Sequence, residues 1–315
     1  MPFSANVNEN NPQLAQVLQE YIKEQRRKRR WGIFFKLFIL GLLIALFLSF
    51  CTDQGDHKIL RDEPHTALIS LEGEIMANGP VDANKVVGAL RMAMKDPGTK
   101  GVILRINSPG GSPVQSDYIY TEIMRLRHQY PNVPVYAVCT EICASGAYYI
   151  AAAAKDIYAN PASMVGSIGV IMKGFGFTDA MKKVGVTQRT IIAGKYKDFM
   201  DPFAPQDPAE TQLAQNMVDI VHEQFIAAVE AGRGARLQKD NPDIFSGLIW
   251  TGAQAKKLGL IDGYGSAGFV ARDVIKEDKI VDYTIKPNPF ERFADRIGAS
   301  AANVILSQVQ VHLSE

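Results

Sequence analysis

Apolar positions follow two different periods along residues 66–288. Short runs that are almost continuously apolar are typical of parallel strands covered on both faces. Between these runs, apolar residues recur every three or four positions, which predicts helices with one buried face. Strands are predicted at residues 67–73, 101–107, 133–139, 156–160, 164–172, 187–192 and 280–285, and helices at 82–94, 114–129, 146–154, 178–184, 208–232, 251–258 and 267–275. Strands that alternate with helices indicate an α/β fold with parallel pairing.

Two amphipathic segments stand out. The helix at 208–232 carries a long apolar stripe that we predict to be buried, made of Leu213, Met217, Ile220, Val221, Phe225 and Val229. Residues 289–315 also have amphipathic spacing. We expect this C-terminal segment to be a plain terminal helix. The alternatives are that it docks on a partner subunit, covers a site or touches the membrane.

A different pattern precedes the α/β region. Residues 31–51 are almost wholly apolar, and about twenty such residues cross a bilayer. Basic side chains are dense before this run, at Lys23, Arg26, Arg27, Lys28, Arg29 and Arg30. Because positive charge stays on the cytoplasmic side, we predict a cytoplasmic tail at 1–30 and a single transmembrane signal anchor at 31–51. A cleaved signal peptide is disfavoured, since the run is long and no small-x-small site follows it. Residues 52–65 then form a tether to a domain at 66–288.

Composition narrows the range of partners. The chain has 315 residues, and its 34 Lys and Arg against 33 Asp and Glu give a formal charge of +1. A balance this even argues against a nucleic-acid partner. Three cysteines, Cys51, Cys139 and Cys143, are too few for a disulfide framework, and small buried roles are favoured over pairing. The sequence has no metal-ligand spacing, and no cofactor is predicted.

Ser145 lies between a predicted strand and an Ala-rich helix. Backbone N–H groups lack partners at the start of a helix, and the helix dipole favours negative charge there. A serine in this place could be a nucleophile, because its attack on a carbonyl creates an anion. It could equally be a helix cap, which is a common role of serine. The local sequence leaves both interpretations open.

A serine nucleophile needs a base. The histidines lie in the tether, in helices or in the terminal segment, and none belongs to a glycine-rich or loop motif: His57, His65, His128, His222 and His312. A lysine can serve only if desolvation lowers its pKa. Lys197 is the preferred candidate, and Lys195 stays open. The predicted dry surroundings of Lys197 come from Phe199, Met200 and Phe203.

The developing oxyanion needs backbone N–H donors. The turn at 108–113 contains Gly110 and Gly111. Glycines let a backbone turn its amides outward and let a substrate approach closely. An ordinary tight turn is the alternative interpretation of this pair.

Four motifs together resemble one known family. They are Ser-Pro-Gly-Gly at 108–111, Cys-Ala-Ser-Gly-Ala-Tyr-Tyr at 143–149, Gly-Ser-Ile-Gly-Val at 166–170 and Gly-Lys-Tyr-Lys-Asp at 194–198. They occur in the order of that family and at about its spacing. Through them the chain resembles, from about residue 66 to 283, the SppA-like signal peptide peptidases, which are membrane-anchored serine proteases. The resemblance implies a ClpP/crotonase-like spiral of repeated β-β-α units.

By this resemblance, Ser145 is the nucleophile, Lys197 is the general base of a Ser-Lys dyad, and Ser167 is a helper serine that hydrogen-bonds the lysine. The single copy of the motifs resembles the short form of the family. Short-form members assemble into a ring or dome in which the lysine of one subunit reaches the serine of a neighbour. The resemblance therefore implies a homo-oligomer with shared active sites.

The resemblance also assigns the oxyanion site and the biology. Gly110 and Gly111 correspond to the oxyanion turn, with Gly111 as the donating amide together with Gly146. The implied substrates are remnant signal peptides and misfolded exported proteins. The implied location is the bacterial inner membrane, with the N-terminus in the cytoplasm and the catalytic domain on the periplasmic or extracytoplasmic side.

Two other functional classes remain. Crotonase relatives share the fold and the glycine turn but act on acyl-CoA thioesters, and they would need neither Ser145 nor Lys197. A non-catalytic membrane scaffold could also keep a protease-like fold, although a degenerate copy should have lost at least one motif. The sequence does not predict the cleavage preference or the number of subunits.

Overall fold

The computed structural model describes residues 12–52 and 63–286, which belong to two separate units of the chain. The second unit contains the helices α2 (Ala83–Lys95), α3 (Pro113–Gln129), α4 (Gly146–Ala152), α5 (Thr178–Lys183), α6 (Pro208–Arg233), α7 (Gly252–Lys257) and α8 (Ala267–Phe269), with short η2 (Gly234–Arg236) and the π-helical η3 (Val270–Ile275). Its strands are β1 (His65–Glu72), β2 (Thr99–Ser108), β3 (Val135–Ala144), β4 (Asp156–Ala159), β5 (Met164–Gly166), β6 (Ile249–Thr251), β7 (Gly263–Tyr264) and β8 (Ile280–Asp282).

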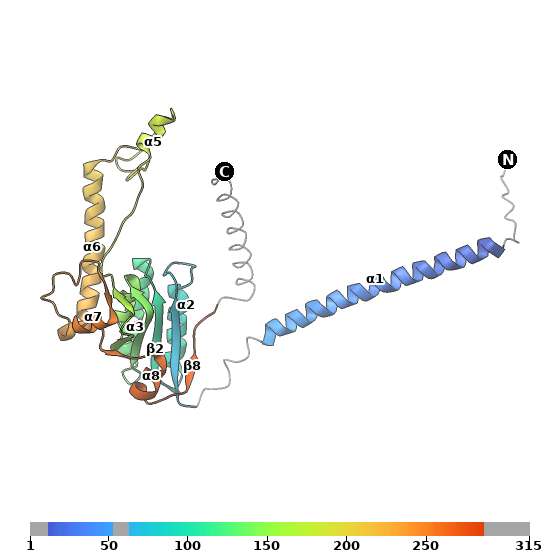
Figure 1. The fold of residues 1–315 in the computed structure, drawn as a ribbon, viewed down its shortest axis with the longest axis horizontal. Helices are drawn as coiled ribbons and strands as arrows, with labels where there is room; N and C mark the ends of the chain where they lie inside the picture. Colours follow the sequence, from blue (N-terminus) through green and yellow to red (C-terminus); the bar gives the residue numbers. More distant parts are fainter. Residues whose placement is uncertain (1–11, 53–62, 287–315) are drawn as a thin grey trace. The chain divides into compact units, whose positions relative to one another are not determined.

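The described part of the first unit is one helix, α1 (Pro12–Thr52), of 41 residues (Figure 1). It contains the predicted span at 31–51 but begins well before it. Within the described residues, no helix combines the length and the apolar character that crossing a membrane requires. The side chains of 46–51, at the end of the predicted span, lie outside the described residues. So do the start of the tail, most of the tether and the C-terminal segment from 287 onward.

An eight-stranded sheet organises the second unit. The strand order is β6-β5-β3-β2-β1-β8, with β4 also beside β3 and β7 beside β4. The pairs are parallel, except that β5 and β6 are antiparallel. The predicted α/β fold with parallel strands is therefore confirmed.

Strand β3 changes its neighbour part-way along its length. Residues 136–139 pair with β4, whereas 142–144 pair with β5, and β2 lies along the other edge of β3. The register joins Ala144 of β3 to Gly166 of β5. Because the two strands are parallel, the residues that follow them, Ser145 and Ser167, leave the sheet side by side.

Helices cover both faces of the sheet, and local sequence signals fix where the longer ones start. One buried cluster unites apolar residues of β1–β3 with those of α2, α3, α4 and α6, and a smaller cluster packs η3 on the other face. Helix α3 starts after Ser112, whose hydroxyl accepts a hydrogen bond from Gln115 N at 3.4 Å. Helix α6 starts after Asp207, which accepts one from Ala209 N at 2.7 Å. A proline follows each cap, because the first helical position needs no N–H donor.

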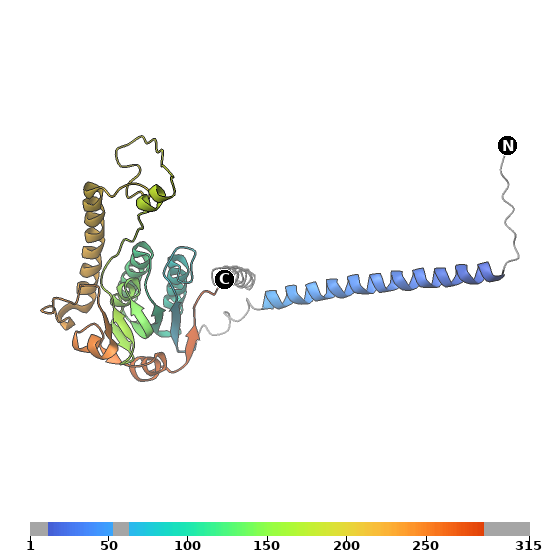
Figure 2. The same ribbon diagram turned by 45° about the horizontal axis from the view of Figure 1, so that its top comes forward.

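Residues 171–207, which we call the arm, extend beyond the sheet at the N-terminal end of α6 (Figures 1 and 2). The arm contains α5 and is held by its own contacts, such as Phe177 N to Pro202 O at 2.7 Å and the Phe177 and Phe203 rings at 5.6 Å. The predicted strand at 187–192 is wrong. This segment has no strand partner, and Ile191 is 99% exposed, so its apolar residues are not the buried face of a sheet.

Two further predictions need correction. The apolar stripe of α6 is buried only in its C-terminal half, at Phe225 and Val229, while Leu213, Met217 and Ile220 are exposed. The strand predicted at 164–172 ends at Gly166, because Ser167 adopts a φ of +52° that a strand cannot continue. The other predicted strands and helices are present, with shifted ends.

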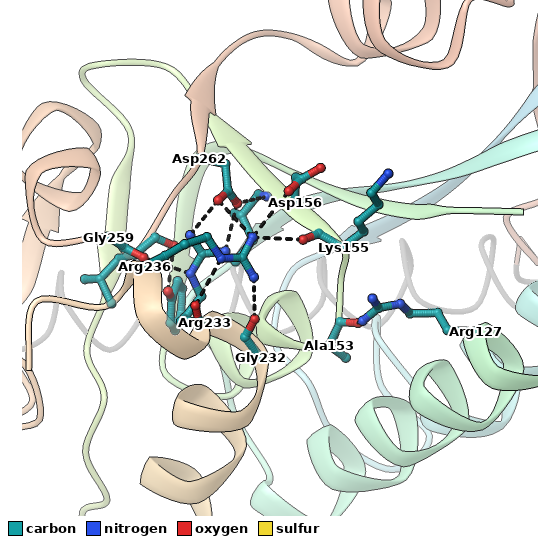
Figure 3. A network of polar contacts seen from close by, with 12 residues as sticks. Arg127, Ala153, Lys155, Asp156, Gly232, Arg233, Arg236, Gly259 and Asp262 are labelled. Carbon is teal, nitrogen blue, oxygen red and sulfur yellow. Dashed lines mark hydrogen bonds and ion pairs between the residues drawn. The ribbon is translucent and has the colours of Figure 1, made fainter. Parts of the chain in front are cut away.

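A polar network fixes the C-terminal end of α6 to the sheet, as Figure 3 shows. Arg233 is only 1% exposed and donates to both carboxylate oxygens of Asp262, at 2.8 and 3.0 Å. Asp262 also accepts hydrogen bonds from Arg236 at 3.0 Å and from Ile157 N at 2.7 Å. Burial alone would raise the pKa of Asp262, but the hydrogen bonds and charge of Arg233 lower that pKa on balance. The network anchors α6 where the helix leaves the core, opposite the arm.

Candidate active site

Ser145 occupies a strained turn between β3 and α4. Its φ and ψ are +54° and −126°, a conformation that residues with a side chain rarely adopt. Its N–H donates to Gly166 O at 2.8 Å, and its carbonyl accepts from Tyr149 N at 3.0 Å. Its hydroxyl makes no capping bond to α4. Ser145 therefore does not serve as a helix cap, and the strain points to another use of its side chain.

The turn adjoins a cavity of about 270 Å³. The cavity lies between the Ser145 turn, the start of α3 and one face of α6. Most of its lining is apolar, which is typical of a site that accepts a ligand side chain. The lining residues are Gly111, Pro113, Val114, Ser116, Asp117, Ser145, Gly146, Tyr149, Gly169, Val170, Ile171, Val221, Gln224 and Phe225.

Gly110 lies in direct contact with the Ser145 turn. Its φ is +97°, and a methyl group on it would be 2.7 Å from Ala144 O and from Gly146 N. It would also be 2.8 Å from Ser145 Cβ. Only glycine fits at this position, because both the backbone angle and the neighbouring backbone exclude a side chain.

Gly111 lines the cavity, whereas Gly110 does not, and the Gly110 N–H donates to Ser108 Oγ at 3.1 Å. Of these two glycines, the structure therefore brings only Gly111 to the cavity. A methyl group on it would overlap the carbonyl oxygen of Ile75, which pairs with this segment through Ser112 N at 2.7 Å. A methyl group on Gly146 would lie 3.4 Å from Gly111 N. Neither the Gly111 nor the Gly146 N–H donates to a backbone or side-chain acceptor within the described residues. Two free donors therefore lie close together beside Ser145.

Ser167 shares the unusual backbone of Ser145. It is the next residue after Gly166, and its φ is +52°. Its N–H donates to Leu248 O at 2.7 Å, which ties it to the segment before β6. Ser167 is partly buried but is not among the residues lining the cavity. Two neighbouring serines in left-handed conformations are unusual, since such strain persists only where the surrounding structure imposes it.

Lys197 lies apart from Ser145 within a single chain. It is exposed on the arm, in a turn closed by its own N–H to Gly194 O at 3.1 Å, and it does not line the cavity. Met200 and Phe203 are themselves exposed, so they do not provide the predicted dry surroundings. Lys195 lies over the Tyr196 ring at 4.8 Å, and its hydrogen bond to that residue raises its pKa. A raised pKa disfavours the neutral form that a base requires.

The described histidines do not line the cavity. His222 on α6 is the one that approaches the site, with Nε2 3.2 Å from Ile168 O. His65 is buried in β1 against Tyr283, with Nε2 2.9 Å from the tyrosine hydroxyl. His57 and His312 lie outside the described residues. His65 was predicted to lie in the tether, and it instead belongs to the first strand of the sheet.

Several residues of the cavity were not predicted from the sequence. Asp117 and Val114 come from the exposed side of α3, and Val221 and Phe225 come from α6. Phe225 belongs to the predicted stripe of α6, but its position beside Ser145 could not be inferred from spacing. Tyr149 lies inside the Ser145 motif, and only its hydrogen bond to Asp117 Oδ1 at 2.9 Å reveals a role in the cavity.

Metal and thiol chemistry have no support in the described residues. Within residues 12–52 and 63–286, no group of three His, Cys, Asp or Glu side chains is arranged to hold a metal ion. Cys139 and Cys143 are free and buried in β3. Burial, with the neighbouring Cys139 thiol, raises the pKa of Cys143. The Cys143 thiol therefore stays protonated, and both cysteines are buried packing groups, as their positions in the sequence suggested.

Comparison with known proteins decides the family. Residues 127–280 match Peptidase family S49, and residues 64–166 match the Clp protease family. A putative protease of Methanocaldococcus jannaschii is 34% identical over 212 residues, which are 66% of this chain and 67% of that protein. The chain belongs to peptidase family S49. The parallel sheet described above agrees with a ClpP-like domain.

Other proteins are similar to this chain over part of their length. A putative signal peptide peptidase SppA of Enterococcus faecium is 32% identical over 196 residues, 62% of this chain and 56% of that protein. A protein of Brucella abortus named Na(+)/H(+) antiporter NhaA is 36% identical over 260 residues, 80% of this chain. The chain spans 35% of the length of that Brucella protein, so the match concerns one part of it.

Proposed function

We propose that this S49 protein is a serine endopeptidase that hydrolyses remnant signal peptides and misfolded exported proteins with a Ser-Lys dyad. The observation that carries the proposal is Ser145, an uncapped serine in a strained turn at the mouth of an apolar cavity. Positive φ at a residue with a side chain is costly, and such strain concentrates at functional positions. The names of the relatives from M. jannaschii and E. faecium agree with this activity.

The free amides of Gly111 and Gly146 supply the proposed oxyanion site. When Ser145 attacks a peptide carbonyl, negative charge develops on the carbonyl oxygen. Two N–H donors that need not reorient stabilise this charge without a reorganisation cost. The contacts of Gly110 with the Ser145 turn keep these donors next to the nucleophile.

Lys197 of a neighbouring subunit is the proposed general base. Lys197 lies on the arm, away from the Ser145 cavity of its own chain. A second chain whose arm covers the Ser145 turn would desolvate the ammonium and lower its pKa. Ser167, beside Ser145 at the end of β5, would accept or donate a hydrogen bond to this lysine.

Exposed apolar side chains on the arm and on α6 support an assembly. A monomeric soluble domain rarely exposes this many large apolar residues together, and such surfaces usually bind a partner. A contact between the arm of one chain and the cavity of the next is head-to-tail, and such contacts close into a ring when the rotation between subunits closes. The exposed residues include Phe175, Val184, Ile191, Leu213, Met217 and Ile220.

The proposed reaction has two steps. Neutral Lys197 accepts the proton of the Ser145 hydroxyl as its oxygen attacks the peptide carbonyl, and the C–N bond breaks as the lysine returns the proton to the leaving amine. Water then attacks the acyl-enzyme, with the same lysine as base, and releases the carboxylic acid and Ser145. Lys197 acts first as a base and then as an acid, which requires that its pKa in the assembled site lie near the working pH.

We also propose that residues 31–51 hold the chain at the bacterial inner membrane, with residues 1–30 in the cytoplasm and the peptidase unit on the extracytoplasmic side. The apolar run and the basic residues at 26–30 support this orientation. The full chain should stay in the pellet after alkaline carbonate extraction of cell membranes, whereas a chain without residues 1–51 should be released. Release of the full chain would contradict the anchor.

Replacing Ser145 by alanine should reduce hydrolysis of an unfolded apolar peptide on the order of 10⁶-fold, because the nucleophile is lost. Peptide cleavage by the detergent-solubilised full chain, at matched oligomer size, measures the effect. Ser163→Ala is the control, since Ser163 is a buried serine bonded to Asn160 N at 3.0 Å outside the cavity. Undiminished cleavage by Ser145→Ala, or no cleavage by an assembled wild type, would overturn the proposed function.

A further inference from the structure

Asp117 is the one charged residue among the lining of the Ser145 cavity in the described part of the chain. It lies in the second turn of α3, on the exposed side of that helix. The remaining walls near it are mostly hydrocarbon, from Val114, Val170, Val221 and Phe225. A single carboxylate beside an apolar cavity favours a side chain with a cationic end, because it offers a charge-assisted hydrogen bond that an apolar side chain cannot make.

The Asp117 carboxylate is held in place from one side only. The Tyr149 hydroxyl donates to its Oδ1 at 2.9 Å, while its Oδ2 has no hydrogen bond from the described residues. Tyr149 is itself fixed by ring contacts with Phe225 at 5.0 Å and with Tyr120 at 5.1 Å. Burial and the bond to Asp117 raise the pKa of Tyr149, so its hydroxyl stays a donor. One carboxylate oxygen therefore remains open to a ligand.

We propose that Asp117 makes the cavity accept a substrate side chain with an aliphatic stem and a cationic end, that is, lysine or arginine. The inference rests on the proposed peptidase function, since Ser145 at the same cavity defines the cleaved bond. The stem packs against the valines and Phe225, and the cation pairs with the free oxygen of Asp117. Long basic side chains combine an apolar stem with a charged tip in this way.

The test uses two peptides that differ by one ammonium group. One carries lysine at the position whose carbonyl is cleaved, and the other carries norleucine, which has the same stem without the charge. The ratio of kcat/KM for lysine over norleucine is measured with the full-length wild type and its variants at matched oligomer size. In Asp117→Asn this ratio should fall about 10-fold, with norleucine cleavage within a factor of about three of wild type.

Two further variants separate charge from packing. Tyr149→Phe keeps the ring and removes the hydroxyl, so the lysine preference should persist. Asp240→Asn changes an exposed aspartate that does not line the cavity, and should leave the ratio unchanged. An unchanged ratio in Asp117→Asn, or an equal loss for both peptides, would overturn the proposal, because Asp117 would then only position Tyr149.

Failure of this inference is distinguishable from failure of the proposed function. If the wild type cleaves norleucine peptide but shows no Asp117-dependent ratio, only the inference fails. If the wild type cleaves neither peptide, the peptidase proposal fails. The binding preference is then measured by fluorescence anisotropy of the two labelled peptides with the Ser145→Ala and the Ser145→Ala/Asp117→Asn proteins. Equal affinities of the Ser145→Ala protein for both peptides would overturn the proposed preference.

Discussion

Replacing Lys197 by alanine should reduce the rate of peptide hydrolysis on the order of 10⁴-fold, because a general base accelerates a reaction by up to about this factor. The oligomer should remain intact, since Lys197 is exposed on the arm and its backbone turn closes through its own N–H. Lys195→Ala is the matched control. It removes a lysine two positions away, whose Nζ lies over the Tyr196 ring. Peptide cleavage at matched oligomer size measures both.

Mixing the inactive variants tests whether the site is shared. A Ser145→Ala subunit retains Lys197, and a Lys197→Ala subunit retains Ser145. After dissociation and random reassembly of equal amounts, about a quarter of head-to-tail contacts should join a Ser145 to a Lys197 and regain activity. Activity that stays absent in verified mixed oligomers would contradict a dyad built between subunits. Full activity of Lys197→Ala alone would contradict the lysine base.

Replacing Asp262 by alanine should lower the free energy of unfolding by about 3–5 kcal/mol, since removing one partner of a buried ion pair leaves the other charge uncompensated. The charge left without its partner is that of Arg233 (Figure 3), which also donates to Gly259 O at 2.8 Å. Urea denaturation followed by circular dichroism measures the change. Asp156→Ala is the control: its contact with the exposed Arg236, at 3.3 Å, should contribute less than about 1 kcal/mol.

The same pair gives a pH dependence of defined sign. The folded state lowers the pKa of Asp262, so its stabilising contribution is present above the usual carboxyl range. That contribution is lost as the pH falls through the lowered value. The difference in unfolding free energy between wild type and Asp262→Ala should therefore shrink in acid. A difference that stays constant down to strongly acidic pH would assign the effect to packing alone.

The core of this fold follows from the sequence. Strands β1, β2 and β3 are nearly continuous apolar runs, which predicted parallel strands. The structure confirms the parallel pairing and buries both faces of these strands. The same rule failed at 187–192, where apolar residues lie exposed on the arm. A hydrophobic pattern reports that a surface avoids water. It does not show whether the residues that bury this surface belong to the same chain or to another one. The same uncertainty applies to the exposed N-terminal half of α6.

Part of the candidate site could be predicted from the sequence, and part could not. The family resemblance implied that Gly110 and Gly111 serve the same site as Ser145. In the structure Gly110 lies against the Ser145 turn, because the two segments follow the neighbouring parallel strands β2 and β3. The positive φ of Ser145 and Ser167 could not be predicted, since serine has no preference for that conformation. Backbone hydrogen bonds to residues distant in the sequence, Gly166 O and Leu248 O, accompany it. Asp117 was missed because it lies on the exposed face of a helix, where a carboxylate is ordinary.

Helix α6 joins the arm to an end that is fixed in the core. Its C-terminal end is pinned by Arg233, while its N-terminal end carries the arm. Its 26 residues span about 39 Å at 1.5 Å per residue. A tilt of about 5° at the pinned end moves the far end by about 3 Å. A displacement of this size is about the length of a hydrogen bond. A small tilt of α6 would therefore make or break contacts at the arm, and would move Val221 and Phe225 in the cavity by a smaller distance because they lie nearer the fixed end.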